Sequence, residues 1–235
     1  MSSPIGLFGS SFNPPHLAHF ALLHAAREQL KLSSIQVIPA GQPWQKPHVI
    51  ASVHRVAMVK AALNDDAQNW EKQAPPPYPI TLNSIEASLS QPSYTIQTLK
   101  QLSSSHPTNT PLVWIMGSDQ LSNLTTWHRW DELLNLCHIA VAQRAGHEVT
   151  ADDLHESLKS YYLTHLSQAD EWQNHPNGYF VTFNLPKMHI SSSAIRAALK
   201  TPTAENQAIL SQLSPSVAAY IQQHQLYGDK KQPHL

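Results

Sequence analysis

Two histidines three residues apart, His16 and His19, stand where a short loop enters a predicted helix. The loop carries Gly9, Ser10 and two prolines, residue types typical of the passage from a strand into a helix. The N–H groups at a helix start attract anions, and first-turn residues three apart point to one side. Two imidazoles in this position suit a phosphate whose charge grows during a reaction.

Two other interpretations of this pair stay open. Both side chains could simply cap and pack the helix, which is the more common role for an isolated pair with this spacing. A zinc site would need a third ligand, and none is obvious, because His24 lies five residues beyond His19. We therefore predict no metal-ligating residues.

A second anion-binding element is predicted at Ser191, Ser192 and Ser193, which follow a strand and open a helix that carries Arg196. Hydroxyls, first-turn N–H groups and a guanidinium make an anion pocket, although serine also serves as an ordinary helix cap. Parallel strands bring such loops to one edge of a sheet, so the two elements are expected to meet. The sequence holds neither G-x-x-x-x-G-K-[ST] nor G-x-G-x-x-G, so a nucleotide must be held in another way.

Alternating strands and helices must position these loops. The pattern predicts a Rossmann-like, doubly wound parallel α/β sheet with flanking helices, in one domain over residues 1–235. Residues 147–178 are interpreted as a helical insertion or lid, and 215–227 as a C-terminal helix. The other predicted strands are Pro4–Phe8, Ile35–Pro39, Leu112–Met116, His138–Ala142 and Tyr179–Phe183, and the other predicted helices are Leu17–Leu30, Ser52–Leu63, Ser93–Leu102, Trp130–Leu136 and Ser192–Lys200.

Composition excludes several classes of protein. The 15 Lys and Arg residues balance 16 Asp and Glu residues, which argues against nucleic-acid binding. One cysteine, Cys137, allows no internal disulfide. No signal peptide and no apolar run long enough to span a bilayer are visible, so we expect a cytoplasmic protein without a membrane partner.

The two predicted anion-binding elements also resemble sequence signatures of a known superfamily. GSSFNPPHLAH (residues 9–19) is similar to the G-x-F-x-P-x-H-x-G-H signature of the nucleotidyltransferase superfamily, and ISSSAIR (190–196) resembles its I-S-S-T-x-I-R. Further segments resemble one member family, the bacterial nicotinate-nucleotide adenylyltransferases. These segments are KPH (46–48), HRVAM (54–58), PSYTIQTL (92–99), WIMGSD (114–119), QRAG (143–146) and the closing pattern that ends in Leu226-Tyr227.

This resemblance implies transfer of AMP from ATP to nicotinate mononucleotide, giving nicotinate adenine dinucleotide and pyrophosphate in NAD biosynthesis. The acceptor phosphate is already an anion, so catalysis would consist of positioning and charge stabilisation, with Mg²⁺ accompanying ATP. The implied partners are ATP and nicotinate mononucleotide. Whether the chain forms a homo-oligomer is left open.

The resemblance also implies roles for individual residues. The catalytic set is His16, His19, Lys46 and Arg196. The ATP-binding set is Gly9, Ser10, Phe12, His16, His19, Gly117, Asp119, Ser191, Ser192 and Arg196. The nicotinate-nucleotide-binding set is Ser11, Lys46, Tyr94, Thr95 and Trp127. Asp119 could instead cap a helix, and Trp127 could instead pack in the core.

Four residues depart from the family pattern. Asn13 replaces an aspartate, Ser10 and Ala18 replace glycines, and Ser193 replaces a threonine. The methyl group of Ala18 is expected to crowd a nucleotide that approaches the backbone, which would reduce affinity or activity. Rival interpretations are an adenylyltransferase with another acceptor (nicotinamide mononucleotide or phosphopantetheine), a non-catalytic nucleotide sensor and a histidine-rich metal-binding module.

Overall fold

Six parallel strands form one sheet in the order β3-β2-β1-β4-β5-β6. The computed structural model describes residues 3–43, 49–71, 79–89, 91–144, 149–186, 188, 190–201 and 203–228. The strands are β1 (Ile5–Ser10), β2 (Ser34–Pro39), β3 (Ile80–Leu82), β4 (Leu112–Gly117), β5 (His138–Arg144) and β6 (Phe180–Leu185). This order is that of a doubly wound fold, in which the chain reverses direction across the sheet between β1 and β4.

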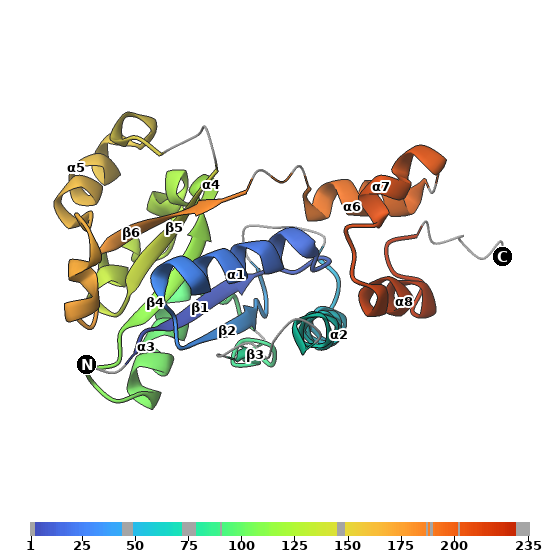
Figure 1. Cartoon of the computed structure of the whole chain (residues 1–235), viewed down its shortest axis with the longest axis horizontal. Coiled ribbons are helices and arrows are strands. Elements are labelled where there is room, and N and C mark those ends of the chain that lie inside the picture. Colours follow the sequence, from blue (N-terminus) through green and yellow to red (C-terminus); the bar gives the residue numbers. More distant parts are fainter. Residues whose placement is uncertain are drawn as a thin grey trace.

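Eight α-helices are described, and they cover both faces of the sheet (Figure 1). They are α1 (Leu17–Leu30), α2 (Ser52–Glu71), α3 (Thr95–Ser105), α4 (Ser118–Ser122), α5 (Glu156–His165), α6 (Ser192–Lys200), α7 (Gln207–Leu210) and α8 (Pro215–Gln223). Helices α6 to α8 gather on the side toward which the arrows of β1 and β6 point. No helix in the described part of the chain is long and apolar enough to cross a membrane.

The core lies in two layers, one on each face of the sheet. Along β4, Val113 and Ile115 join one buried cluster, while Leu112, Trp114 and Met116 join the other. This alternation follows from the two-residue period of a strand, and both faces are apolar because helices cover both. Helices α1, α2 and α8 contribute to the first cluster, and α3 and α5 contribute to the second.

The pairing between β1 and β4 stops before either strand ends. The register runs from Ile5–Leu112 to Leu7–Trp114, whereas β1 continues to Ser10 and β4 to Gly117. Both strands remain paired on their other sides, β1 with β2 and β4 with β5. The two strands therefore part toward their carboxyl ends, at the point where the order of strands reverses.

The predicted fold class is confirmed, and the predicted helices Leu17–Leu30 and Ser192–Lys200 have these bounds in the structure. Helix α2 continues to Glu71 rather than ending near Leu63, because its polar second half lies on the surface and shows no apolar stripe. The predicted helix over Trp130–Leu136 is a 3₁₀ helix over Trp130–Asn135. The short strand β3 was missed, because three residues give no periodic signal.

Two segments of the chain were predicted to be additions to the sheet and its flanking helices. Residues 147–178 hold α5 and two 3₁₀ helices, Ala151–Asp153 and Asp170–Asn174. The helix expected over 215–227 ends at Gln223, and turns continue to Tyr227. The prediction that 147–178 acts as a lid stays a prediction.

Candidate active site

A cleft of about 630 Å³ opens at the carboxyl ends of β1 and β4. Open parallel sheets bind ligands at this reversal of strand order, because the loops on either side turn away from each other. The cleft is lined by residues that follow β1 and β4 and by the starts of α1, α3 and α6. Of the residues predicted for the site, it is lined by Gly9, Ser10, Ser11, His16, His19, Tyr94, Thr95, Gly117, Asp119, Trp127, Ser191, Ser192 and Arg196.

The two turns predicted to meet are joined by hydrogen bonds. The Ser192 hydroxyl donates to the carbonyl of Pro14 at 2.9 Å, and Nη1 of Arg196 donates to the carbonyl of Asn13 at 2.8 Å. Nη2 of Arg196 also donates to Oγ of Ser193 at 3.1 Å. The phosphate loop, as we call residues 9–16, is thus tied to the start of α6 across more than 170 residues of sequence.

The histidine pair begins α1, and its two rings pack against each other at an angle of 33°. The backbone N–H of His16 donates to Nδ1 of His19 at 3.1 Å, and the ring centroids are 3.8 Å apart. Since Nδ1 of His19 accepts this bond, a neutral His19 carries its proton on Nε2. The arrangement offers an N–H donor from a ring that lines the cleft.

His16 is the more deeply placed of the two. Its side chain is largely buried, and burial lowers its pKa to about 4, so the ring is neutral near pH 7. Its Nδ1 has no hydrogen-bond partner within the residues that the structure describes. A buried polar atom without a partner is costly, and a phosphate in the cleft could satisfy it.

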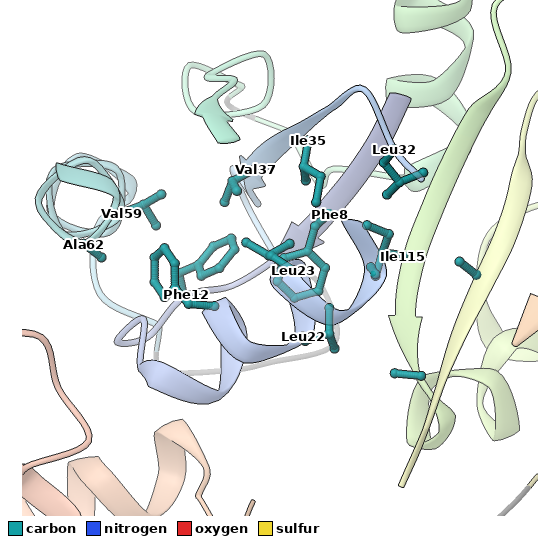
Figure 2. Close-up of a cluster of buried hydrophobic side chains, with 14 of the residues drawn as sticks. Phe8, Phe12, Leu22, Leu23, Leu32, Ile35, Val37, Val59, Ala62 and Ile115 are labelled. Atoms are coloured by element: carbon teal, nitrogen blue, oxygen red, sulfur yellow. The ribbon is translucent and has the colours of Figure 1, made fainter. Parts of the chain in front are cut away.

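Phe12 differs from the other residues predicted for ATP binding. Its ring is buried in the core with Phe8 and Val59, and it is not part of the cleft lining (Figure 2). The ring lies 5.0 Å from that of His19, and its backbone is left-handed, with φ +48°. The Phe12 ring therefore packs in the core beside His19, so the predicted contact between Phe12 and ATP would have to be made by its backbone and stays a prediction.

Arg55 of α2 braces the phosphate loop from behind, a role that the sequence reasoning missed. Its guanidinium, almost fully buried, donates to the carbonyls of Ser11 (3.0 Å), Gly41 (2.7 Å) and Ile50 (2.9 Å). The carboxylate of Glu86 provides a nearby negative charge. A signal was available, because Arg55 precedes Met58 and Val59 at helical spacing and so falls on the apolar stripe of α2.

Two glycines allow close approaches at the floor of the cleft. A Cβ on Gly9 would stand 2.6 Å from Cη2 of Trp114, so the missing side chain admits the indole ring beneath β1. A Cβ on Gly117 would stand 2.5 Å from Oδ1 of Asp119. Gly117, not Asp119, is the cap of α4, so the interpretation of Asp119 as a helix cap is wrong.

An aromatic end of the cleft is formed around the start of α3. Tyr94 is the residue that precedes this helix, Thr95 begins it, and the Tyr94 ring lies 4.7 Å from that of His128. Trp127 is half-buried, lines the cleft and packs on the second core cluster. Both interpretations of Trp127, as a ring platform and as a packing residue, thus describe parts of its environment.

Lys46 lies outside the described residues. Within them, no group of three or more His, Cys, Asp or Glu side chains could hold a metal ion. Asp119 is the acidic residue predicted for the site, and its Oδ2 accepts a hydrogen bond from Gln120 at 2.8 Å. The site therefore fits a divalent ion that arrives on a triphosphate better than an ion held by protein ligands alone.

Residues 7–198 match the model of the family described as cytidylyltransferase-like. A protein of Bordetella petrii named "Probable nicotinate-nucleotide adenylyltransferase" is 34% identical over 95% of this chain and 98% of its own length. A protein of Dechloromonas aromatica with the same name is 35% identical over 97% of this chain and 99% of its own length.

Solved structures share the fold. A nicotinic acid mononucleotide adenylyltransferase of Plasmodium falciparum, solved in complex with NaAD, superposes with a TM-score of 0.71 at 21% identity. The superposition covers 96% of this chain and 98% of that one. The same enzyme in complex with APC gives a TM-score of 0.70. At this level of identity the likeness concerns the fold alone.

Proposed function

The chain belongs to the cytidylyltransferase-like family and, within it, to the nicotinate-nucleotide adenylyltransferases, and we propose that it transfers AMP from ATP to nicotinate mononucleotide. The products are nicotinate adenine dinucleotide and pyrophosphate, which makes the chain a nucleotidyltransferase of NAD biosynthesis. The observation that supports this most strongly is the hydrogen-bonded contact between the phosphate loop and the start of α6 at one cleft. We place the reaction in the cytoplasm.

The reaction needs no protein base, because the attacking oxygen belongs to a phosphate that is already an anion. That oxygen forms a bond to the α-phosphorus of ATP, and the bond from the α-phosphorus to the departing pyrophosphate breaks. Two anions must be brought together, so the protein contributes alignment and positive or N–H-bearing groups. The cleft supplies these groups from two helix starts.

In this proposal, the two sides of the cleft bind different phosphates of ATP. His16 and His19 contact the phosphates near the reacting α position. Arg196 and the first-turn N–H groups of α6, with Ser191, hold the β- and γ-phosphates as pyrophosphate leaves. Ser192 acts differently from our expectation, because its hydroxyl proton is used on Pro14, so it ties the two turns together.

The backbone at Gly9, Ser10 and Gly117 lets the nucleotide lie close to β1 and β4. Asp119 contacts the ribose or the adenine edge in this proposal. Lys46 is proposed from the family pattern alone to steady the reacting phosphates. Mg²⁺, bound to the triphosphate, supplies charge neutralisation when present.

Nicotinate mononucleotide is proposed to occupy the end of the cleft near α3. Trp127 would stack on the pyridine ring, with Ser11, Tyr94 and Thr95 beside it. The carboxylate would meet N–H groups at the start of α3, because a helix start attracts anions. Nicotinamide mononucleotide lacks this negative charge, so the same site would bind it more weakly.

The experiment that tests this function is a pyrophosphate-release assay with ATP and one of three acceptors. Nicotinate mononucleotide is expected to give turnover well above that with nicotinamide mononucleotide or phosphopantetheine. Equal or better turnover with either of the others would reassign the acceptor, and release with none of them would leave a nucleotide sensor. His19→Ala should lose most of the activity, whereas His24→Ala, on the same helix but paired with Asp66, should keep it.

A further inference from the structure

The side chain of Asn13 in the phosphate loop is held by a residue from the other end of the chain. The Tyr227 hydroxyl donates to Oδ1 of Asn13 at 2.8 Å. The backbone carbonyl of Asn13 accepts at the same time from Nη1 of Arg196. Asn13 thus connects a tyrosine outside the cleft with the guanidinium that lines it.

Helix α8 is fastened to α2 at two points, which fixes where the chain beyond it can reach. At its first turn, the backbone N–H and the hydroxyl of Ser216 donate to the Asp65 carboxylate at 2.8 and 2.6 Å. Further along, the Tyr220 hydroxyl and Nδ1 of His54 are hydrogen-bonded at 3.0 Å. Because α2 also carries Arg55, one helix supports the phosphate loop and the segment that holds Tyr227.

The backbone after α8 takes a conformation that non-glycine residues rarely adopt. Gln225 has φ +50° and Tyr227 has φ +66°, both in the left-handed region. Such conformations persist where the surrounding structure holds them, and they cluster at functional sites. The left-handed residues Gln225 and Tyr227 turn the chain from the end of α8 back to the phosphate loop, where the Tyr227 hydroxyl meets Asn13.

The Tyr227 hydroxyl keeps its proton and can therefore donate its hydrogen bond to Asn13. Burial raises the pKa of Tyr227 far above its ordinary value, and the nearby guanidinium charges of Arg196 and Arg55 oppose this only in part. The hydroxyl therefore keeps its proton over the pH range in which the protein works. Tyr227 does not line the cleft, so it would act through other residues.

We propose that Tyr227 is a positioning residue for adenylyl transfer, fixing the Asn13 carboxamide so that the Asn13 carbonyl holds the Arg196 guanidinium at the cleft. The inference rests on the proposed function, since Arg196 is assigned to the departing pyrophosphate there. With the Tyr227 hydroxyl removed, Asn13 loses its fixed orientation and Arg196 loses a rigid acceptor. The chemical step should suffer more than binding of the acceptor nucleotide.

The test compares Tyr227→Phe with Tyr161→Phe, which removes a tyrosine hydroxyl that donates to the Asp131 carbonyl at 2.9 Å and does not line the cleft. Small displacements of positioning groups lower rates by up to about 100-fold, and we expect Tyr227→Phe to lower kcat about 10-fold. It should weaken ATP binding about 3-fold and leave KM for nicotinate mononucleotide within about 2-fold on the same reasoning. Tyr161→Phe should keep all three values.

A double-variant cycle shows whether the effect passes through Arg196. In an Arg196→Lys background, Tyr227→Phe should lower kcat by less than about 2-fold, since coupled residues are not additive. A full 10-fold loss in that background would overturn the proposal, as would equal losses of kcat in Tyr227→Phe and Tyr161→Phe. Unchanged kcat in Tyr227→Phe would also overturn it.

Two further measurements keep the proposal open to refutation. If Tyr227→Phe does not fold, Asn13→Ala removes the same hydrogen bond from the acceptor side. Because Asn13 itself lines the cleft, its loss of kcat must also shrink to less than about 2-fold in the Arg196→Lys background, and a full loss there would overturn the proposal. If the wild-type protein is inactive with nicotinate mononucleotide, the proposed function fails instead. The ATP dissociation constants of the two tyrosine variants then decide the inference, and equal constants would reject it.

Discussion

Lowering the pH from 7.5 to 5.0 should destabilise the free protein through two buried imidazoles, His16 in the cleft and His138 outside it. Burial lowers the pKa of each ring to about 4. His138 is fully buried, its Nε2 bonds to the carbonyl of His175 at 3.0 Å, and its Nδ1 accepts from the N–H of Tyr179 at 3.3 Å. Protonation of His138 at Nδ1 would break the bond from Tyr179.

The size of the effect follows from proton linkage. An unfolded histidine has a pKa near 6.5, so the unfolded chain takes up these protons first as the pH falls. Stability is therefore complete above about pH 7 and is lost as the pH falls through 6.5 toward 4. At pH 5.0 each ring costs about 2 kcal/mol relative to pH 7.5, or about 4 kcal/mol together. That is a large part of the 5–15 kcal/mol typical of a folded domain, roughly speaking.

ATP should reduce the contribution of His16 to the pH dependence of stability and leave that of His138 unchanged. Phosphates beside His16 favour its cation, so saturating ATP should roughly halve the loss of unfolding free energy between the two pH values, to about 2 kcal/mol. Urea denaturation of the wild-type protein, with and without ATP, measures this. His16→Gln should lose about 2 kcal/mol over the same pH interval in both conditions, because only the His138 contribution remains.

His138→Asn serves as the matched control, since it leaves the cleft histidine in place. Its loss should be about 2 kcal/mol without ATP and close to zero with ATP, because the remaining contribution is that of His16. The comparison cancels protonation of ATP itself, which is common to all variants. The reasoning is refuted if the wild-type protein and His16→Gln lose equal stability between pH 7.5 and 5.0 without ATP.

Three other substitutions probe the cleft. Arg196→Lys should lower kcat about 100-fold in the pyrophosphate assay, because a lysine cannot reproduce the two-pronged hydrogen bonding of a guanidinium; Arg129→Lys at an exposed ion pair should have no effect. Gly9→Ala should lower the urea-measured unfolding free energy by about 1–3 kcal/mol, since its Cβ would overlap the Trp114 ring, and unchanged stability would contradict this packing. Ala18→Gly should lower KM for ATP by removing a methyl group from the cleft lining, and an unchanged KM would show that the methyl group does not crowd the nucleotide.

The fold was predictable because its signals are local. The apolar run at Leu112–Met116 is long enough to indicate a buried strand, and the loops after it and after β1 carry glycine and helix-starting residues. The rule that parallel strands share one carboxyl edge then brought His19 and Arg196 to a common cleft, and they do line one. The element that gave no such signal, β3, is too short for periodicity to appear.

The contacts that hold the site in place could not be predicted from sequence patterns, because they join side chains that lie far apart in the sequence. The position of Phe12 in the motif is the same whether its ring faces the nucleotide or the core. Only its packing against Phe8 in the structure shows that the ring faces the core. The bond between Tyr227 and Asn13 joins opposite ends of the chain, and no spacing rule connects them. Arg55 shows an intermediate case, in which its place on an apolar stripe indicates burial but not its three carbonyl acceptors.

The parting of β1 from β4 has a consequence for how the ligand is recognised. Beyond Leu7 and Trp114 the facing edges of the two strands are no longer joined to each other, and Gly9, Ile115 and Gly117 lie along the opening. A molecule inserted there would meet peptide groups, which every amino acid carries alike. Replacing Ile115 by alanine would therefore leave these peptide groups in place, whereas a Cβ added at Gly9 or Gly117 would overlap a neighbouring side chain.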